Sequence, residues 1–528
     1  MNSKFFSIIK MLYGFVFVTI IGLLLFSTNI AYNRKLEFAL SNVIIFALIL
    51  TFLLLFISVY YWIKNKKTFL KKDTTINFDK IVFIATLILF LGQCYVFYNI
   101  FFVSDWDTLL LRSFADTIIN KGDLTGVNEY FSLYPNNLFI SYFYLFLQKI
   151  NTYYGIYNGE YSYMCVVIVN CIINSFSCWL AYKTAKTFTT PLFALFAYIL
   201  CVFSVGISGW TVIGYSDALA LFIPILSVYL YSKQYKNKKT KAIGLLSSVT
   251  ISAVGYFIKP QCLFVLIAIA IIEIIKLISK FSLKSLLFLI SICLITITTF
   301  TTINTSINLL NKKYNVQLDE NKTLGLTHFL MMGLNEEQNG AYSLEDVLYS
   351  SSFDTKEERT KANISVFKER IVTMKSELFT HLKKKLLSTF NDGTFAWTLE
   401  GRFFYNVPEN INSKASVFLK SIYHKGENSL YFETIQHISW LFILALSSLS
   451  VLSKKTIKYK EQLSVIWIVI LGFILYEMLF EVRSRYIYIF VPLLCTLVPI
   501  GIMNAVDLSR KTYCFLQKSI KKITNKAN

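Results

Sequence analysis

The chain has 528 residues, 55% of them apolar and only 16% charged, with a mean hydropathy of +0.54 and a formal net charge of +21. Soluble domains contain about 45–50% apolar and 25% charged residues, so this composition is that of a membrane protein. It excludes a disordered chain, a secreted disulfide-rich domain and a soluble nucleic-acid-binding protein. At roughly 20 residues for each spanning helix, the length accommodates about a dozen spans and one sizeable insert.

Apolar runs long enough to cross a membrane, allowing for tilt, occur along most of the chain. Twelve of them are predicted as spans, at 11–30, 43–62, 81–103, 161–182, 191–207, 212–231, 243–258, 262–275, 286–303, 435–451, 463–480 and 486–505. The first is long for a signal peptide and no small-residue cleavage site follows it, so we expect it to be retained. The prediction is an all-α polytopic protein of the plasma membrane with both termini in the cytoplasm.

Lysine and arginine are concentrated in every second loop between these runs. Short cytoplasmic loops carry such an excess, so the alternation supports the predicted orientation. The long segment 304–434 instead holds 16 basic and 16 acidic residues and would face outside. The excess positive charge therefore lies in the other segments, where it indicates topology and contact with anionic membrane lipids, and it predicts no nucleic-acid partner.

These runs divide the chain into regions. We expect an N-terminal transmembrane hairpin at 1–80, a transmembrane core at 81–303 with a first outer loop at 104–160, an α-rich extracellular domain at 304–434, C-terminal transmembrane helices at 435–506 and a basic cytoplasmic tail at 507–528. The apolar run 138–147 would break the lysine alternation as a span, so it is predicted to lie on the outer surface as a juxtamembrane helix. Residues 391–397 and Arg402 are expected at the rim of the site described next.

Two clusters of polar residues fall in the first outer loop. Residues 104–107 (Ser-Asp-Trp-Asp) place two carboxylates before an amphipathic helix, and a simple helix N-cap is the alternative interpretation. Residues 130–137 (Tyr-Phe-Ser-Leu-Tyr-Pro-Asn-Asn) open the surface helix, and ordinary turn chemistry is the alternative there.

Two more clusters fall at the predicted outer ends of later spans, where ionisable groups are costly and often functional. Asp217 near the end of one span would face residues 259–261 (Lys-Pro-Gln) in a very short turn, although a lysine there can also snorkel to the interface. Residues 477–486 carry two glutamates, two arginines and a tyrosine. Paired guanidiniums suggest a bound phosphate or carboxylate, and a structural ion pair is the alternative.

The four clusters are far apart in sequence but at one predicted membrane depth, so a bundle that gathers them makes one outward-facing pocket. Such a pocket suits the transfer of a sugar from a polyprenyl-phosphate carrier. A carboxylate would take the proton of the acceptor hydroxyl, and lysine and arginine would stabilise the departing phosphate. Direct displacement would invert the anomeric centre.

These motifs, in this order, resemble the integral-membrane glycosyltransferases of the C superfamily (GT-C), and within it bacterial relatives of the protein mannosyltransferase and aminoarabinose transferase families. The resemblance covers about residues 81–505 and rests on Asp105 and Asp107, Tyr134-Pro135, Asp217, Lys259-Pro260, the segment 328–335 with Gly340 and Tyr342, and Glu481-x-Arg483-x-Arg485-Tyr486. Two spans precede the usual first helix, and the acids are Asp-Trp-Asp instead of adjacent.

The resemblance implies roles for individual residues. The base would be Asp107, with Asp105 second. The donor phosphate would be bound by Lys259, Arg483, Arg485, Tyr486 and Glu481. The pocket and acceptor side would include Tyr134, Asn136, Asn137, Asp217, His328 and Arg402. No cofactor is required, and a divalent cation such as Mg²⁺ or Mn²⁺, if used, would bind Asp105, Asp107 and Asp217.

The predicted partners are a polyprenyl-phosphate sugar, such as one on undecaprenyl phosphate, and a cell-envelope glycan acceptor. Wall polysaccharide, teichoic acid, lipid glycan and protein all remain open as acceptors. Three alternatives to this function remain. They are a polysaccharide polymerase or ligase that uses polyprenyl-diphosphate glycans, a twelve-span secondary transporter, and a structural membrane protein.

Overall fold

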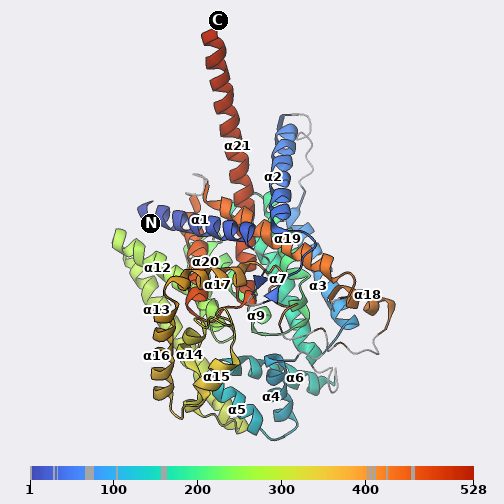
Figure 1. Cartoon of the computed structure of the whole chain (residues 1–528), viewed down its shortest axis with the longest axis vertical. Coiled ribbons are helices and arrows are strands. Elements are labelled where there is room, and N and C mark those ends of the chain that lie inside the picture. The colour runs from blue at the N-terminus through green and yellow to red at the C-terminus, as the bar shows by residue number, and fades with distance from the viewer. Residues whose placement is uncertain are drawn as a thin grey trace.

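The computed structural model describes residues 3–27, 30–31, 34–65, 76–102, 105–155, 163–400, 404, 407, 412–423, 426–452 and 458–527. Arg402 lies outside this part of the chain. The described residues are almost wholly helical, and their one sheet is a short antiparallel pair, β1 (Ile30–Ala31) and β2 (Arg34–Lys35). Figure 1 shows a bundle of long helices with the C-terminal helix projecting from one end. The predicted all-α polytopic architecture is confirmed.

In the described part of the chain, nine helical segments are long and apolar enough to cross a membrane. They contain α1 (Ser3–Phe26), α2 (Asn42–Asn65), α3 (Phe78–Asn99), α7 (Met164–Phe188), α12 (Leu263–Ser279), α13 (Leu283–Tyr314), α19 (Ser429–Ser448), α20 (Lys460–Leu479) and α21 (Val491–Ala527). The segments Pro191–Gly206 and Ser216–Ser232 are apolar but shorter, and α11 (Lys238–Gly255) carries more polar residues. The total of twelve spans therefore stays a prediction.

The helices that correspond to the predicted spans 191–207 and 212–231 are broken. After α8 (Pro191–Cys201) the chain passes through a π-helical turn and a 3-10 turn, and then through the short helix α9 (Ser216–Leu219) into α10 (Phe222–Ser232). Broken backbone is tolerated at membrane depth where other protein groups satisfy it. Here the Asn170 side-chain amide donates to the carbonyls of Trp210, Thr211 and Ile213. The break brings Asp217 into the interior of the bundle, where it is fully buried.

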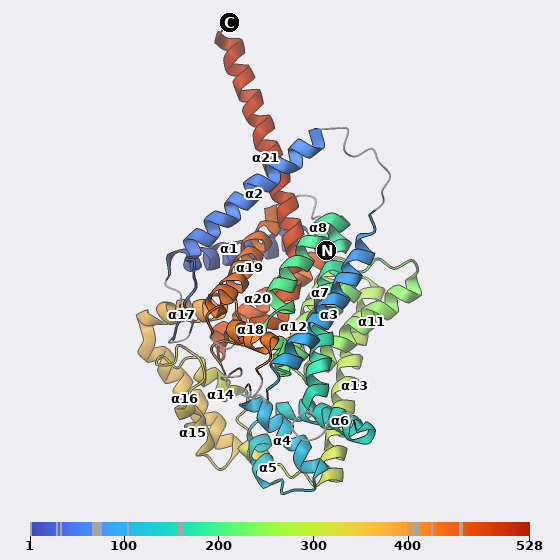
Figure 2. The ribbon, with the colours of Figure 1, turned by 90° about the vertical axis from the view of Figure 1, so that its right-hand side faces the viewer.

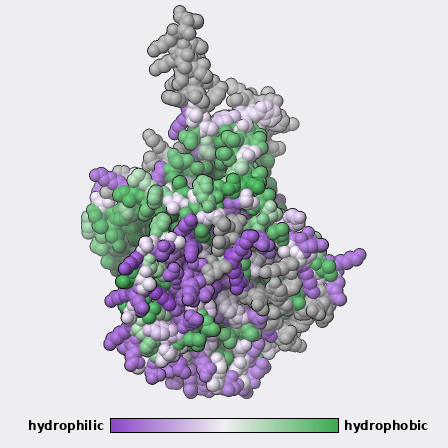
Figure 3. All heavy atoms as spheres, in the orientation of Figure 1, coloured by the Kyte–Doolittle hydropathy of each residue, from purple (hydrophilic) through white to green (hydrophobic). Residues whose placement is uncertain are grey.

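Small helices gather at the end of the bundle opposite the C-terminus, and we call this the site end (Figures 1 and 2). They include α4 (Asp107–Ile119), α5 (Thr125–Leu133), α6 (Leu138–Tyr154), α14 (Gly325–Met332), α15 (Leu344–Ser351) and α16 (Lys356–Met374). The run 138–147 is helical as predicted, with one face buried against α4 and α7 and Phe146, Ile150 and Tyr153 exposed. Figure 3 shows apolar side chains over the upper and middle part of one face, and hydrophilic ones towards the site end.

Two predictions differ from the structure, one on where a span ends and one on where a segment of the predicted extracellular domain packs. Helix α13 has 32 residues, about 48 Å at 1.5 Å per residue, and continues well past residue 303 as one rod. Helix α17 (Leu378–Phe390), which follows α16 in the predicted extracellular domain, packs against α1 and α20 inside the bundle. Residues 391–397 are correspondingly buried and not at a rim, because Trp210 and Trp440 donate to the backbone carbonyls of Phe395 and Phe390.

Candidate functional site

The predicted polar clusters meet at the site end in one group of charged and aromatic side chains, which we call the polar cluster. Its charged members are Asp107, Asp217, Lys259, Glu400, Glu481, Arg483 and Arg485. They come from segments that are far apart in sequence, and aromatic rings connect them. The predicted convergence of acids and cations is thus present in the fold.

Asp107 is the first residue of α4, and two tyrosine hydroxyls hold its carboxylate. Tyr130 donates to Oδ1 at 2.9 Å and Tyr215 donates to Oδ2 at 2.8 Å. Burial and the charge of Asp107 raise the pKa of Tyr130. A tyrosine hydroxyl, with an ordinary pKa of about 10, is in any case a neutral donor at physiological pH. Asn137 in turn donates to the Tyr130 hydroxyl at 2.7 Å and fixes its direction. Within the described residues, Asp107 forms no ion pair with a lysine or arginine.

Asp105 has different surroundings although it is only two residues away. Its side chain is exposed, and its backbone carbonyl accepts a hydrogen bond from Thr108. The residue that caps α4 is Trp106, and no side-chain hydrogen bond caps the helix. Neither aspartate is therefore the N-cap, although Asp107 does stand in the first turn of α4, where the helix dipole favours an acid, as the alternative interpretation expected.

Trp106 adopts a backbone conformation that non-glycine residues rarely have, with φ = 70°. Such conformations cost about 1–3 kcal/mol and concentrate at functional sites. Here the conformation brings the indole ring beside the Arg485 guanidinium, whose central carbon is 4.6 Å from the ring centroid. The same guanidinium lies 5.2 Å from the ring centroid of Tyr215. These two rings join the Asp107 end of the polar cluster to its cationic end.

Asp217 lies between two cations in the interior. Its Oδ1 is 2.8 Å from Nζ of Lys259, and its Oδ2 is 2.7 Å from Nη1 of Arg485. Lys259 also lies over the Tyr486 ring, 4.1 Å from its centroid. Burial lowers the pKa of Lys259, and the negative charge of Asp217 opposes that effect. A buried charge of either sign needs such a partner, so Asp217 is best described as the counter-ion of the two cations.

The terminal motif forms a turn after α20 that presents its arginines to carboxylates. Arg483 contacts Glu481 Oε1 at 3.0 Å, and the Tyr486 hydroxyl donates to Glu481 Oε2 at 3.0 Å. Burial raises the pKa of Glu481, but Arg483 and Arg485 outweigh it and hold that pKa below its usual value. Glu400 bridges the two arginines, with Oε1 3.3 Å from Arg483 Nη1 and Oε2 2.9 Å from Arg485 Nε.

The turn of the terminal motif is supported by α14 and the segment that follows it. The backbone amides of Glu481 and Val482 donate to the carbonyls of Phe329 and Gly340. Lys385 of α17, which is fully buried, donates to the carbonyls of Gly333, Met478 and Phe480 at 2.7, 3.1 and 2.7 Å. This segment therefore positions the terminal motif.

His328 does not line an acceptor surface. It is fully buried, and its Nδ1 lies 2.7 Å from the Ser350 hydroxyl of α15. Burial lowers the pKa of His328 to about 4, so the ring is neutral at physiological pH. The predicted role is replaced by a structural one in the interior of the domain.

The remaining predicted residues lie around Asp107 and Arg483. Asn136 donates to the side chain of Asn137, and the Tyr134 ring packs on that of Tyr130, with centroids 5.3 Å apart. Burial raises the pKa of Tyr134, and its neighbours Tyr342, Asp107 and Glu481 act in the same direction. Tyr342 is 43% exposed and its ring centroid lies 5.6 Å from the Arg483 guanidinium carbon, so the polar cluster reaches the surface here.

Sequence reasoning missed four contributors, namely Trp106, Tyr215, Glu400 and Lys385. Trp106 lies inside the predicted motif 104–107 and Tyr215 lies two residues before Asp217, which is a usable signal. Glu400 and Lys385 are ordinary charged residues in a loop region rich in both signs. Only burial distinguishes them, since the relative exposure of Glu400 is 8% and that of Lys385 is 0%.

The residues proposed for a metal do not fit a divalent cation as they are arranged. Both oxygens of Asp217 face cations, and those of Asp107 accept hydrogen bonds from tyrosines. In the described part of the chain, no group of three or more His, Cys, Asp or Glu side chains is placed to hold a metal ion.

The fold and the polar cluster define a class, a helical integral membrane protein with a buried acid–base group at one end of its bundle. Comparison with protein families agrees with that class. A family described as "conserved hypothetical integral membrane protein" matches residues 2–506, and the chain belongs to this family. No curated protein matches the chain.

Proposed function

We propose that the protein is an inverting glycosyltransferase that moves a sugar from a polyprenyl-phosphate carrier to a cell-envelope acceptor on the outer face of the plasma membrane. The observation that carries the proposal is the state of Asp107. Its carboxylate is oriented by two neutral tyrosine hydroxyls and neutralised by no cation among the described residues. A carboxylate so held is positioned to accept a proton.

In the proposed reaction, Asp107 takes the proton of the acceptor hydroxyl as the acceptor oxygen attacks the anomeric carbon of the donor sugar. The new bond joins that oxygen to the anomeric carbon. The bond from the anomeric carbon to the phosphate oxygen breaks, and its electron pair leaves with the polyprenyl phosphate. Attack opposite the leaving group inverts the anomeric centre, and cations stabilise the negative charge on the phosphate.

The cations of the polar cluster are paired with carboxylates, so a donor phosphate must replace one of them. Glu400 is the candidate, because its two oxygens reach Arg483 and Arg485 in the way that two phosphate oxygens would. In this proposal Glu400 occupies the phosphate position of the empty enzyme. Asp217, which also pairs with Lys259, keeps Arg485 in place throughout.

The test is a pair of variants compared in cells. Asp107→Asn should lower transfer by about 10²–10⁴-fold, the usual contribution of a general base, with normal protein levels. The control is Asp105→Asn, which removes an exposed carboxylate two residues away and should stay within about threefold of the parent. Cell-envelope glycan composition and immunoblotting are the measurements. Unchanged glycans with Asp107→Asn would contradict the proposal and favour a structural role.

A donor comparison separates the proposal from a polymerase or ligase. Membranes containing the protein are given either a polyprenyl-monophosphate sugar or a polyprenyl-diphosphate glycan. Transfer only from the monophosphate supports the proposal. Transfer only from the diphosphate overturns it.

A further inference from the structure

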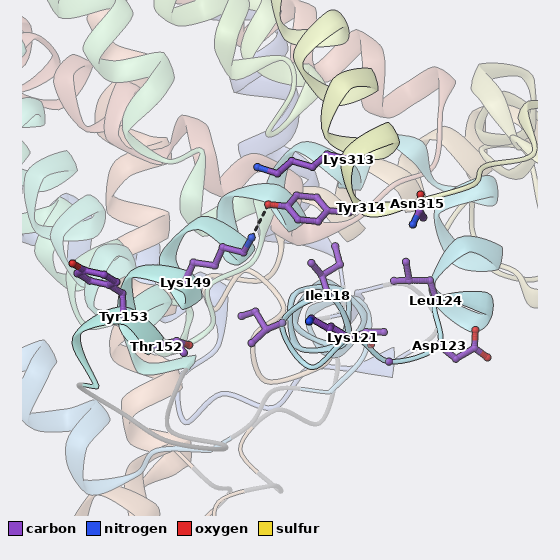
Figure 4. Close-up of a pocket in the computed structure, with 13 residues that line it drawn as sticks. Ile118, Lys121, Asp123, Leu124, Lys149, Thr152, Tyr153, Lys313, Tyr314 and Asn315 are labelled. Atoms are coloured by element: carbon purple, nitrogen blue, oxygen red, sulfur yellow. Dashed lines mark hydrogen bonds between the residues drawn. The ribbon is translucent and has the colours of Figure 1, made fainter.

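A second polar feature lies at the far end of α4 from Asp107. It is a cavity of about 870 Å³ between the last turn of α4, helix α6 and the end of α13 (Figure 4). Its volume is within the range of about 300–1,000 Å³ that is usual for small-ligand sites. The lining residues that carry charge are Lys121, Lys149, Lys313 and Asp123.

The three lysines have no acidic partner among the described residues. The fourth charged residue, Asp123, accepts hydrogen bonds from the Thr125 amide at 3.0 Å and the Thr125 hydroxyl at 2.7 Å and pairs with none of the lysines, so the lining carries three positive charges and one negative charge. This differs from the polar cluster, where each arginine and lysine faces a carboxylate. The cavity therefore has an excess of positive charge that the fold leaves uncompensated.

Tyr314 holds two of these lysines in the cavity. Lys149 donates to the Tyr314 hydroxyl at 2.6 Å, and the ammonium of Lys313 lies 5.5 Å from the centroid of the same ring. Figure 4 shows Lys149 reaching the Tyr314 hydroxyl from α6, while Lys313 extends beside the ring from α13, the helix that also carries Tyr314. The two ammonium groups repel each other at this distance, and a bound anion would reduce that repulsion.

The α13 side of the cavity lies beyond the lipid headgroups. Lys313 lies ten residues after the predicted apolar run of α13 ends at Ile303, which is about 15 Å along the helix. The headgroup layer is only about 5–8 Å thick on each side of the bilayer. Lys149 and Tyr153, on the other side of the cavity, belong to α6, which is predicted to lie on the membrane surface. A dissolved anion and a lipid phosphate can therefore both reach the cavity, and the test below separates the two sources.

Helix α4 connects the cavity to Asp107. Thr117, which lines the cavity, is ten residues after Asp107 on this helix, about 15 Å away along its axis. We propose that the cavity binds a phosphate or carboxylate group of an anionic polymer that serves as the acceptor, while another part of that polymer presents its hydroxyl to Asp107. This inference rests on the proposed function, because it assigns the acceptor class of the same enzyme.

The test is a binding measurement that needs no transfer. The purified full chain is placed in nanodiscs and titrated with a fluorescently labelled glycerol-phosphate oligomer. The test protein, which we call the cavity variant, carries Lys121→Gln, Lys149→Gln and Lys313→Gln together. The matched control is Lys312→Gln, Lys322→Gln and Lys356→Gln together, which changes three exposed lysines of the same region and gives the same net charge.

The cavity variant should bind the oligomer about tenfold more weakly, because it loses the binding free energy of three exposed ion pairs. The affinity of the control should change by less than about twofold. All these lysines are exposed, so thermal unfolding should match the parent in both proteins. Equal weakening by both variants would overturn the proposal, since it would indicate general charge attraction. The single variant Lys149→Gln gives a second measurement if the triple variant is unstable.

Two further arms separate the ligand sources. If the oligomer binds only when the nanodisc lacks phosphatidylglycerol, the cavity is a lipid-headgroup site and the proposal is wrong. If inorganic phosphate competes with the oligomer equally in the parent and in the cavity variant, the proposal is also wrong. The binding measurement needs no transfer and compares the parent with lysine variants that all keep Asp107. A failure of the proposed function would therefore appear as retained transfer in Asp107→Asn, independently of binding at the cavity.

Discussion

Asp105 and Asp107 are separated by one residue, yet the fold treats them in opposite ways. Asp105 is exposed, whereas Asp107 accepts hydrogen bonds from Tyr130 and Tyr215. The unusual backbone of Trp106 lies between them and brings the indole ring to Arg485. One acid of the motif is thus solvated and the other is oriented by hydrogen bonds, which supports Asp107, the base that the resemblance implies, over Asp105.

Glu400 provides a residue-level test of donor binding. Glu400→Gln removes the carboxylate charge that faces Arg483 and Arg485, so the apparent KM for the polyprenyl-phosphate sugar should fall by about tenfold, equivalent to about 1.4 kcal/mol. Steady-state kinetics in membranes measure this change. The control is Glu427→Gln, an exposed acid outside the polar cluster, which should leave the KM unchanged.

An increase in KM with Glu400→Gln would contradict this role. It would mean that Glu400 holds the arginines in place for the donor and does not compete with it. The Arg485 contacts with Asp217 and Trp106 are independent of Glu400, so the arginine should remain in the cluster in either case.

At the scale of elements, the terminal motif depends on helix α17. Lys385 ties three carbonyls together, one from the segment after α14 and two from the end of α20. Buried carbonyls that lose their donor keep the full cost of desolvation. The element that positions Arg483 and Arg485 is thus a helix of the predicted extracellular domain, although no motif marks it.

Lys385→Met should lower the free energy of unfolding by about 2–4 kcal/mol at neutral pH, since three carbonyls lose a charged donor. The deficit should also grow with pH. Burial lowers the pKa of Lys385 from 10.5 to about 7. Between pH 7 and pH 10.5 the Lys385 side chain is protonated in the unfolded chain and neutral in the folded chain, so the free energy of unfolding of the wild type rises with pH. Lys385→Met has no such proton, so its free energy of unfolding does not rise in this way and the difference between the two proteins grows.

Denaturant or thermal unfolding of both proteins in detergent at pH 6 and pH 9 measures the difference. Lys384→Met is the control, because Lys384 is the preceding residue of α17 and is exposed. It should stay within about 0.5 kcal/mol of the parent at both pH values. A deficit for Lys385→Met that is equal at pH 6 and pH 9 would contradict the assigned protonation change.

At the scale of the whole molecule, charge is divided between the two ends of the bundle. The polar cluster and the small helices lie at the site end, while Lys186 pairs with Asp79 and Lys276 with Glu461 towards the other ends of α7 and α12. The proposed orientation puts the site end outside the cell.

Cysteine labelling tests this orientation. A membrane-impermeant maleimide should label Lys356→Cys at the start of α16 in intact cells, and should label Lys239→Cys in α11 only after the membrane is permeabilised. Both positions are exposed, so access depends on the side of the membrane alone. Labelling is compared with that of the parent chain. The reverse pattern would place the site end in the cytoplasm and contradict the proposed acceptor.

The sequence by itself determined the class of the protein, its helical architecture and the position of most polar motifs. The reason is that the cost of burying charge in lipid makes each charged residue near a span informative. It also indicated that Asp217, Lys259 and Arg485 would meet, since short turns and helix ends at one depth leave few other arrangements.

Only the tertiary structure decided which groups those residues contact. Glu400 reaches the arginines from a segment more than 80 residues earlier in the chain, and Lys385 becomes a buried support through the packing of α17 between α1 and α20. The break that carries Asp217 depends on Asn170 of another helix. Such contacts join residues that are distant in sequence, so they cannot be predicted from local periodicity or composition.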